Sequence, residues 1–235
     1  MYPQLGHTIL HFISRMIAPQ TQQLWTVASC AISSRVIVSA MRRPLQPFGA
    51  RATAILLLAG LLASACAPVT LDAIRADVAA GQGHLISTVP FIAQEAYQCG
   101  PAALAMVLRY WGAPADPEEI GRALYLPSAR GVLNLELEFE ARRRGFRTEA
   151  FEGTLDRAKA ELRQGRPIIV FQDLGRGPVS VPHFAVLLGY DDRSEVVVLH
   201  SGTTAYHILT YGEFLRTWVA RRAWSLLITP RGPAA

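Results

Sequence analysis

The spacing of apolar residues changes along this chain of 235 residues, from a helical period to short strand-like runs. The segment 99–111 predicts a mostly buried helix, because it carries one charge, Arg109, and its large apolar residues recur every three or four positions. Pro101 suits the first turn of that helix, and Gly112 suits its end. Apolar runs in the second half predict strands at 168–171, 184–190, 195–199, 206–209 and 224–228.

Two patterns compete in the segment 133–144. Its apolar residues alternate over 133–139, which favours a strand. Its glutamates precede its arginines, however, and this order suits the dipole and the i,i+4 ion pairs of a helix, Glu138–Arg142 and Glu140–Arg144. We therefore expect a helix there. Other helices are expected near 71–80, from 116, at 154–164 and at 212–218, and other strands at 84–91 and 146–151.

The order of these elements predicts the fold class. Helices dominate the first half of the pattern, and short strands that suit an antiparallel sheet dominate the second half. This arrangement is typical of an α+β fold.

The charge of the chain is distributed unevenly. The net charge is +5 and the pI is about 9.4, values that would suggest a nucleic-acid partner. Five of the 23 basic residues precede Asp72, the first acidic residue, and the other 18 equal the 18 acidic residues in number. The run Arg142–Arg144 is balanced by the glutamates before it. We therefore expect no nucleic-acid partner.

The front of the chain has the pattern of an export signal. Arginines at 42, 43 and 51 precede an uncharged run at 52–65, which is shorter than a membrane-spanning helix. The run ends in Ala63-Ser64-Ala65-Cys66, which resembles the lipobox of bacterial lipoproteins, where the cysteine is lipidated. We expect a signal peptide at 41–65, a lipid anchor on Cys66 and a tether at 66–85. A plain cleaved signal and an uncleaved anchor are the alternatives.

The segment 1–40 lacks acidic residues and clear periodicity. We interpret it as a mis-assigned upstream extension, disordered or irregular, with Met41 as the true start. Ala67 after the anchor cysteine favours the periplasmic face of the outer membrane in a two-membrane bacterium.

Three cysteines offer no disulfide framework, and Cys99 is the one free thiol expected in the exported domain. It stands where the buried helix begins. Unpaired N–H groups and the positive end of the dipole favour a thiolate there, so we expect a lowered pKa and a nucleophile. A small buried apolar residue is the alternative.

A nucleophilic thiol needs a base, and His183 is the best placed of four histidines in the expected domain. It opens the strand HFAVLLGYDD directly after the glycine-containing stretch 175–182, so it can face a cleft. His84 lies in the lead-in, and His200 and His207 lie near strand ends.

Two motifs carry a resemblance to a known family. VPFIAQEAYQCGPAALAMVLRYWG, followed by HFAVLLGYDD, resembles the double-glycine leader peptidases of bacteriocin exporters and their stand-alone relatives. The resemblance covers roughly residues 86–230 and implies a papain-like cysteine peptidase fold. It implies Cys99 as nucleophile, His183 as general base, and Gln94, rather than Gln98, as oxyanion donor with the Cys99 N–H.

The chain departs from this family at the residue that orients the histidine. The family places Asp or Asn at the end of the strand after the hairpin, whereas this chain has His200-Ser201-Gly202. Ser201 is a weak candidate for the orienting role and His200 is another, while Asp191 and Asp192 suit the hairpin turn better. A Cys–His dyad is the simplest interpretation, and its activity is in question without the third group.

The expected function is hydrolysis of a peptide or an exported protein at the cell envelope. The chain has no Gly-rich phosphate loop and no cluster with metal-ligand spacing, so we expect no cofactor and no metal. A weakly active or inactive peptide-binding module, and an amidase or transglutaminase-type acyl transferase, are the alternatives. The sequence does not indicate an oligomeric state.

Overall fold

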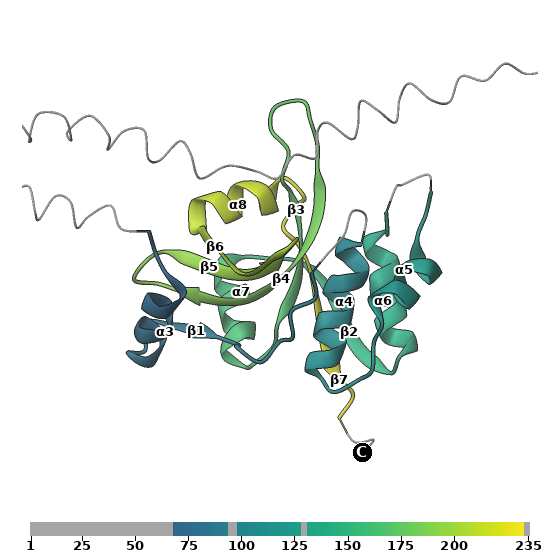
Figure 1. Ribbon diagram of the computed structural model, residues 1–235, viewed down its shortest axis with the longest axis horizontal. Helices are drawn as coiled ribbons and strands as arrows, with labels where there is room; N and C mark the ends of the chain where they lie inside the picture. The colour runs from purple at the N-terminus through teal and green to yellow at the C-terminus, as the bar shows by residue number, and fades with distance from the viewer. Residues whose placement is uncertain (1–67, 94–97, 128–130, 233–235) are drawn as a thin grey trace, which may run out of the picture. The chain divides into compact units, whose positions relative to one another are not determined.

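An antiparallel sheet of seven strands runs through the part of the chain that the computed structural model describes, residues 68–93, 98–127 and 131–232 (Figure 1). Six strands follow the spatial order β2–β7–β3–β4–β5–β6, and β1 pairs with β4 beyond the first residue of β3. The strands are β1 (Gly83–Leu85), β2 (Phe146–Glu152), β3 (Ile168–Asp173), β4 (Pro182–Asp191), β5 (Val196–Ser201), β6 (Thr204–Thr210) and β7 (Trp224–Pro230).

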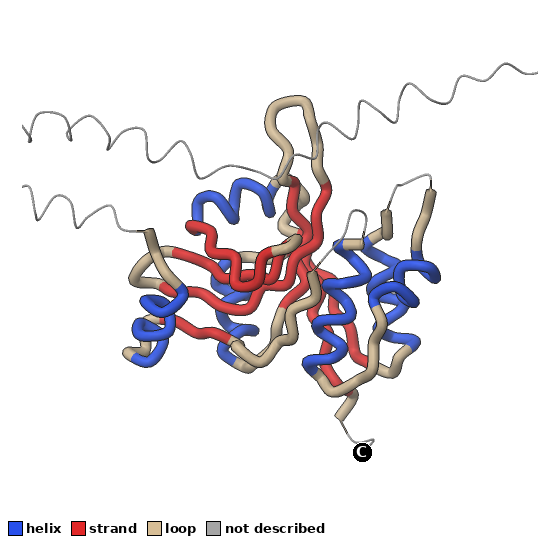
Figure 2. The backbone as a smooth tube through the Cα atoms, viewed as in Figure 1, coloured by secondary structure: helices blue, strands red, loops and turns tan. Residues whose placement is uncertain are grey.

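Six helices pack around this sheet in the described residues: α3 (Leu71–Ala79), α4 (Cys99–Tyr110), α5 (Pro117–Leu124), α6 (Asn134–Arg143), α7 (Leu155–Arg163) and α8 (Tyr211–Val219). Figure 2 shows α4, α5 and α6 grouped beside one end of the sheet, with α8 beside another part of it. Neighbouring residues of a strand point to opposite faces. Phe184 of β4 contacts α4, whereas Gln172 of β3, opposite His183, bonds to α8. The two helices therefore cover opposite faces of β3 and β4. The predicted α+β class is confirmed.

Helix α4 forms the centre of the core because its sequence offers almost nothing polar to water. Every side chain from Ala102 to Leu108 is buried against the sheet or the neighbouring helices. At its end the indole Nε1 of Trp111 donates to the carbonyl of Ile228 over 2.8 Å, which ties the helix to β7. This bond anchors the C-terminal end of α4, and Cys99 stands at the opposite end.

The ambiguous segment 133–144 is helical, as its charge order predicted. Glu138 pairs with Arg142, and the Glu140 carboxylate pairs with Arg143 and, at 2.6 Å, with Arg144. The Glu140 side chain is only 2% exposed. The ion pairs at i,i+4 form only in a helix, and they therefore predicted the structure of this segment better than the alternation of apolar residues.

Removal of the Glu140 carboxylate is expected to destabilise the domain. In Glu140→Ala, the Arg144 guanidinium loses a buried partner, so we expect the free energy of unfolding to fall by about 3 kcal/mol. Glu119→Ala is the matched control, because that carboxylate contacts the same arginine at 3.1 Å but is 63% exposed, and its removal should cost less than about 1 kcal/mol. Urea unfolding of both variants checks this. Equal losses would contradict a buried role for Glu140.

The lead-in before residue 86 contributes more structure than a tether. Residues 71–79 form α3, and β1 continues the sheet beside β4, pairing Leu85 with Gly189. A Cβ at Gly189 would lie 2.6 Å from the carbonyl oxygen of His84, so this close approach needs glycine. The sheet therefore starts before the boundary expected at residue 86, and the strand predicted at 84–91 is limited to 83–85.

The expected signal peptide and the anchor Cys66 lie outside the described residues. Among the helices that the structure does describe, none combines the length and apolarity that crossing a bilayer requires.

Candidate active site

Cys99 is the first residue of α4 and its thiol is partly buried. The backbone N–H groups of Phe184, Gly100 and Cys99 itself act to lower the pKa of the thiol. Phe184 belongs to β4 and directly follows His183, so the start of α4 and the start of β4 meet at the thiol. Gly100 permits this approach, because a Cβ there would already lie 3.3 Å from the Phe184 ring.

The pKa of the Cys99 thiol is raised, not lowered as its position at a helix start predicted. Burial of the thiol is the largest effect, and it exceeds the opposing effect of the backbone N–H donors. Phe184 and Leu137 pack beside Gly100 in the first turn, and apolar surroundings disfavour the thiolate. The resting thiol is therefore protonated at neutral pH.

His183 lies near the start of β4, and Ser201 lies at the end of β5. The imidazole Nε2 is 2.9 Å from the Ser201 Oγ, which is within hydrogen-bond distance. The register explains this contact: Val186 pairs with His200, so His200 shares the face of Val186 and Ser201 shares the face of His183. The structure thus brings to the histidine the residue that the sequence offered as a weak candidate orienter.

His200 is engaged elsewhere. It is fully buried, its Nε2 is 3.1 Å from the carbonyl oxygen of Val89, and its Nδ1 accepts the N–H of Tyr206. Its ring also lies edge-on to Phe91. Both nitrogens are occupied on the other face of the sheet, so His200 does not orient His183.

The two aspartates of the hairpin are also remote from His183. Asp191 ends β4, and its carboxylate accepts the N–H of Arg193 in the turn. Asp192 pairs with Lys159 at 2.5 Å. Asp191 lies eight residues along the strand from His183, a distance of roughly 26 Å. Their expected role in the turn is confirmed.

Burial, and to a smaller extent repulsion from His207, lower the pKa of His183 to about 4. The Ser201 hydroxyl brings no negative charge to oppose these effects. The imidazole of His183 is therefore uncharged at neutral pH. The family that the motifs resemble has an Asp or Asn in the orienting position, where this chain has Ser201.

Gln172, His207 and Glu213, three polar residues on elements near His183, were given no role from the sequence. His207 of β6 is half-buried and acts on the His183 charge, while Glu213 of α8 acts on His207. Gln172 of β3 stands directly opposite His183, is 1% exposed, and donates from Nε2 to the Thr217 hydroxyl over 2.7 Å. The available signal was a glutamine inside the apolar run IIVFQD, which alone does not reveal its strand partner.

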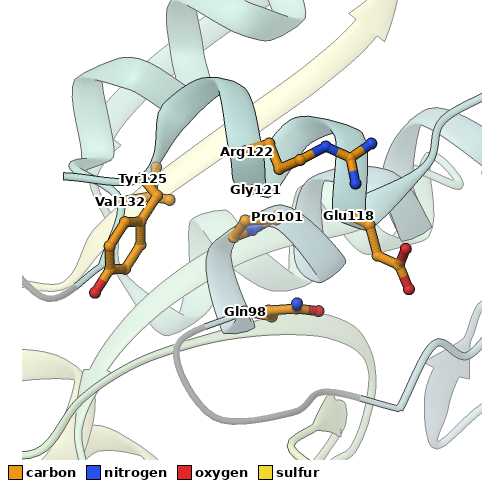
Figure 3. Close-up of a pocket in the computed structure, with 7 residues that line it drawn as sticks. All are labelled: Gln98, Pro101, Glu118, Gly121, Arg122, Tyr125 and Val132. Atoms are coloured by element: carbon orange, nitrogen blue, oxygen red, sulfur yellow. The ribbon is translucent and has the colours of Figure 1, made fainter. Parts of the chain in front are cut away.

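The remaining predicted site residues are not all placed. Gln94, the expected oxyanion donor, lies outside the described residues, as does the expected lipidation site Cys66. Gln98, the less favoured oxyanion candidate, is the residue before α4. Its side chain lines a pocket between the first turn of α4 and helix α5 (Figure 3). Within the described ranges, no group of three or more His, Cys, Asp or Glu side chains is arranged to hold a metal ion.

Residues 86–225 match the model of the Peptidase C39 like family. The chain belongs to this family. The match spans both Cys99 and His183, and it agrees with the resemblance found in the two motifs. The predicted papain-like fold is confirmed.

Several solved structures are similar to this C39-like chain. One, described as a C39-like peptidase from Bacillus anthracis, has a TM-score of 0.55 and 18% identity, covering 64% of this chain and 98% of that one. The peptidase domain of Streptococcus ComA, a bifunctional ABC transporter of a quorum-sensing pathway, has a TM-score of 0.48 and 18% identity, covering 61% and 99%. None of the curated proteins matches the chain.

Proposed function

We propose that this C39-like protein is a cysteine peptidase that hydrolyses a peptide or an exported protein. One observation carries the proposal: the backbone N–H of Phe184, the residue after His183, acts on the Cys99 thiol, and the His183 Nε2 is 2.9 Å from the Ser201 Oγ. The proposed nucleophile starts α4, the proposed base lies near the start of β4, and the proposed orienting hydroxyl ends β5.

The proposed reaction starts from a neutral pair. The imidazole Nδ1, the nitrogen not facing Ser201, takes the thiol proton as the sulfur attacks the peptide carbonyl. The tetrahedral intermediate collapses to a thioester, and the leaving amine takes the proton from His183. Water then attacks the thioester with His183 as base, which releases the acid and restores the thiol. The Cys99 N–H and Gln94 are the proposed oxyanion donors.

Ser201 is the proposed positioning residue. Its hydroxyl can accept an N–H from Nε2, which fixes the ring and leaves Nδ1 unprotonated. It adds no charge that would stabilise an imidazolium. Orientation without charge predicts a slower enzyme than one with a carboxylate at this position.

A peptide-binding module with little activity is the second candidate. The observation in its favour is the neutral pair, because a raised thiol pKa and a lowered imidazole pKa both oppose the thiolate–imidazolium form. Substrate profiling also tests the third alternative, an amidase or transglutaminase-type transferase.

We also propose an envelope location, with a lipid on Cys66 holding the domain at a membrane surface. The support is the apolar run 52–65 that ends in small residues before this cysteine. Envelope fractionation with Cys66→Ser as control tests the anchor: the variant should leave the membrane fraction.

The peptidase proposal is tested by labelling Cys99 with substrate-like electrophiles. A library of peptidyl vinyl sulfones is expected to label Cys99 in a reaction that needs His183, because the bound imidazole removes the thiol proton. Iodoacetamide should react slowly at neutral pH and faster only above the usual thiol range, because the Cys99 pKa is raised. Intact-mass measurement over a pH series reads both reactions.

The same experiment separates the two candidates. A peptide-binding module predicts that peptides protect Cys99 from iodoacetamide while no vinyl sulfone labels it faster than a model thiol. Labelling that is equally fast in wild type and His183→Ala would contradict the peptidase proposal. Muropeptide substrates, with Cys99→Ala as control, extend the profile to amidase chemistry.

A further inference from the structure

A pocket of about 510 Å³ opens beside the first turn of α4. Figure 3 shows it between this turn, helix α5 and the chain at Val132. Sites of this size hold a large side chain together with some adjoining main chain. The catalytic steps described above make no use of this pocket.

The pocket lies within reach of a substrate bound at Cys99. Gln98, which directly precedes the nucleophile, and Pro101, two residues after it, both line the pocket. The pocket therefore adjoins the first turn of α4, where the proposed nucleophile stands.

The lining has two chemically different sides. Pro101, Tyr125 and Val132 form an apolar side, and Tyr125 is 43% exposed. Gln98, Glu118 and Arg122 form the other side, which is polar. Glu118 gives this side a negative charge and Arg122 a positive charge. An aromatic or long aliphatic side chain suits the apolar side, and the main chain around it suits the polar side.

Gly121 of α5 keeps the pocket open. A Cβ at this position would meet only Pro101, at 3.7 Å, which is an ordinary contact. A larger side chain therefore extends into open space without displacing backbone. This position gives a direct means of filling the pocket.

Resting on the proposed peptidase function, we propose that the pocket selects a bulky substrate residue next to the cleaved bond. The substrate class is then a peptide or protein with an aromatic or long aliphatic residue there. A pair of glycines, which the resemblance to double-glycine peptidases implies, would leave the pocket empty.

The test compares vinyl sulfone peptides that differ only in the residue one or two positions before the electrophile. Tyrosine or leucine is expected to label Cys99 at least about tenfold faster than glycine, since even one methylene in an apolar pocket changes rates by about that factor. In Gly121→Leu this preference should fall to within about twofold. Ala123→Leu, an exposed position of the same helix outside the lining, should keep it.

The outcomes separate this inference from the peptidase proposal. Labelling at equal rates by all probes, or a preference unchanged in Gly121→Leu, overturns the pocket inference and leaves the peptidase proposal intact. Absence of labelling by every probe, while iodoacetamide still reacts, overturns the peptidase proposal and this inference with it. Thermal unfolding of Gly121→Ala and Gly121→Leu shows whether each variant is folded.

Discussion

Cys99→Ala is expected to abolish peptide hydrolysis, with a fall in kcat/KM of about 10⁴-fold or more. The thiol is the proposed nucleophile, and no other cysteine of the described residues is free to replace it. The variant should still fold and still bind peptides, because alanine fits the space of a partly buried cysteine at the start of α4. Hydrolysis of a labelled peptide pool and peptide affinity together check this expectation.

His183→Ala is expected to cause a loss of similar size, because the nucleophile and its base act as one unit. The double variant should lose little more than either single variant. His84→Ala is the matched control, since this half-exposed histidine pairs with Tyr190 at the far end of β4. Retention of most activity in either Cys99→Ala or His183→Ala would refute the proposed dyad.

Ser201→Asp is expected to produce the second largest effect, a gain. A carboxylate beside Nε2 favours the charged imidazole, so the pKa of His183 should rise by about 1–3 units from its lowered value of about 4. In the proposed dyad, an imidazolium at His183 in turn favours the Cys99 thiolate. Ultraviolet absorbance of the thiolate at neutral pH should increase, and kcat/KM should rise by about tenfold or more.

Two further substitutions separate orientation from charge. Ser201→Asn keeps a hydrogen-bond acceptor without charge, so it should maintain the rate while shifting the pH profile little. Ser201→Ala removes the acceptor, and kcat/KM should fall by about fivefold or more, in line with the loss of one hydrogen bond. If the pH profile is the same in Ser201→Asp and wild type, the serine does not act on His183.

The helices and strands were largely predictable because their signals are local. Helical spacing placed α4, and the order of glutamates and arginines correctly resolved the ambiguous segment as α6. The expected strands of the second half all occur, with bounds shifted by a few residues. The exception is the lead-in, where β1 is three residues long and exists only because β4 offers an edge for pairing.

The histidine's partner was not predictable, because it depends on strand register. Ser201 and His200 are adjacent in sequence, and successive residues of a strand point to opposite faces. The pairing of Val186 with His200 decides which of them meets His183. A shift of one residue would have exchanged their roles.

By itself, the sequence determined the α+β class, the position of Cys99 at a helix start and the place of His183 at a strand entrance. These follow from periodicity, capping residues and turn residues, which act over a few neighbours. The tertiary structure alone decided the direction of the Cys99 pKa, the contact of His183 with Ser201 and the pocket kept open by Gly121. Each depends on burial and on packing between segments far apart in the chain, and no local pattern encodes the environment that such packing creates.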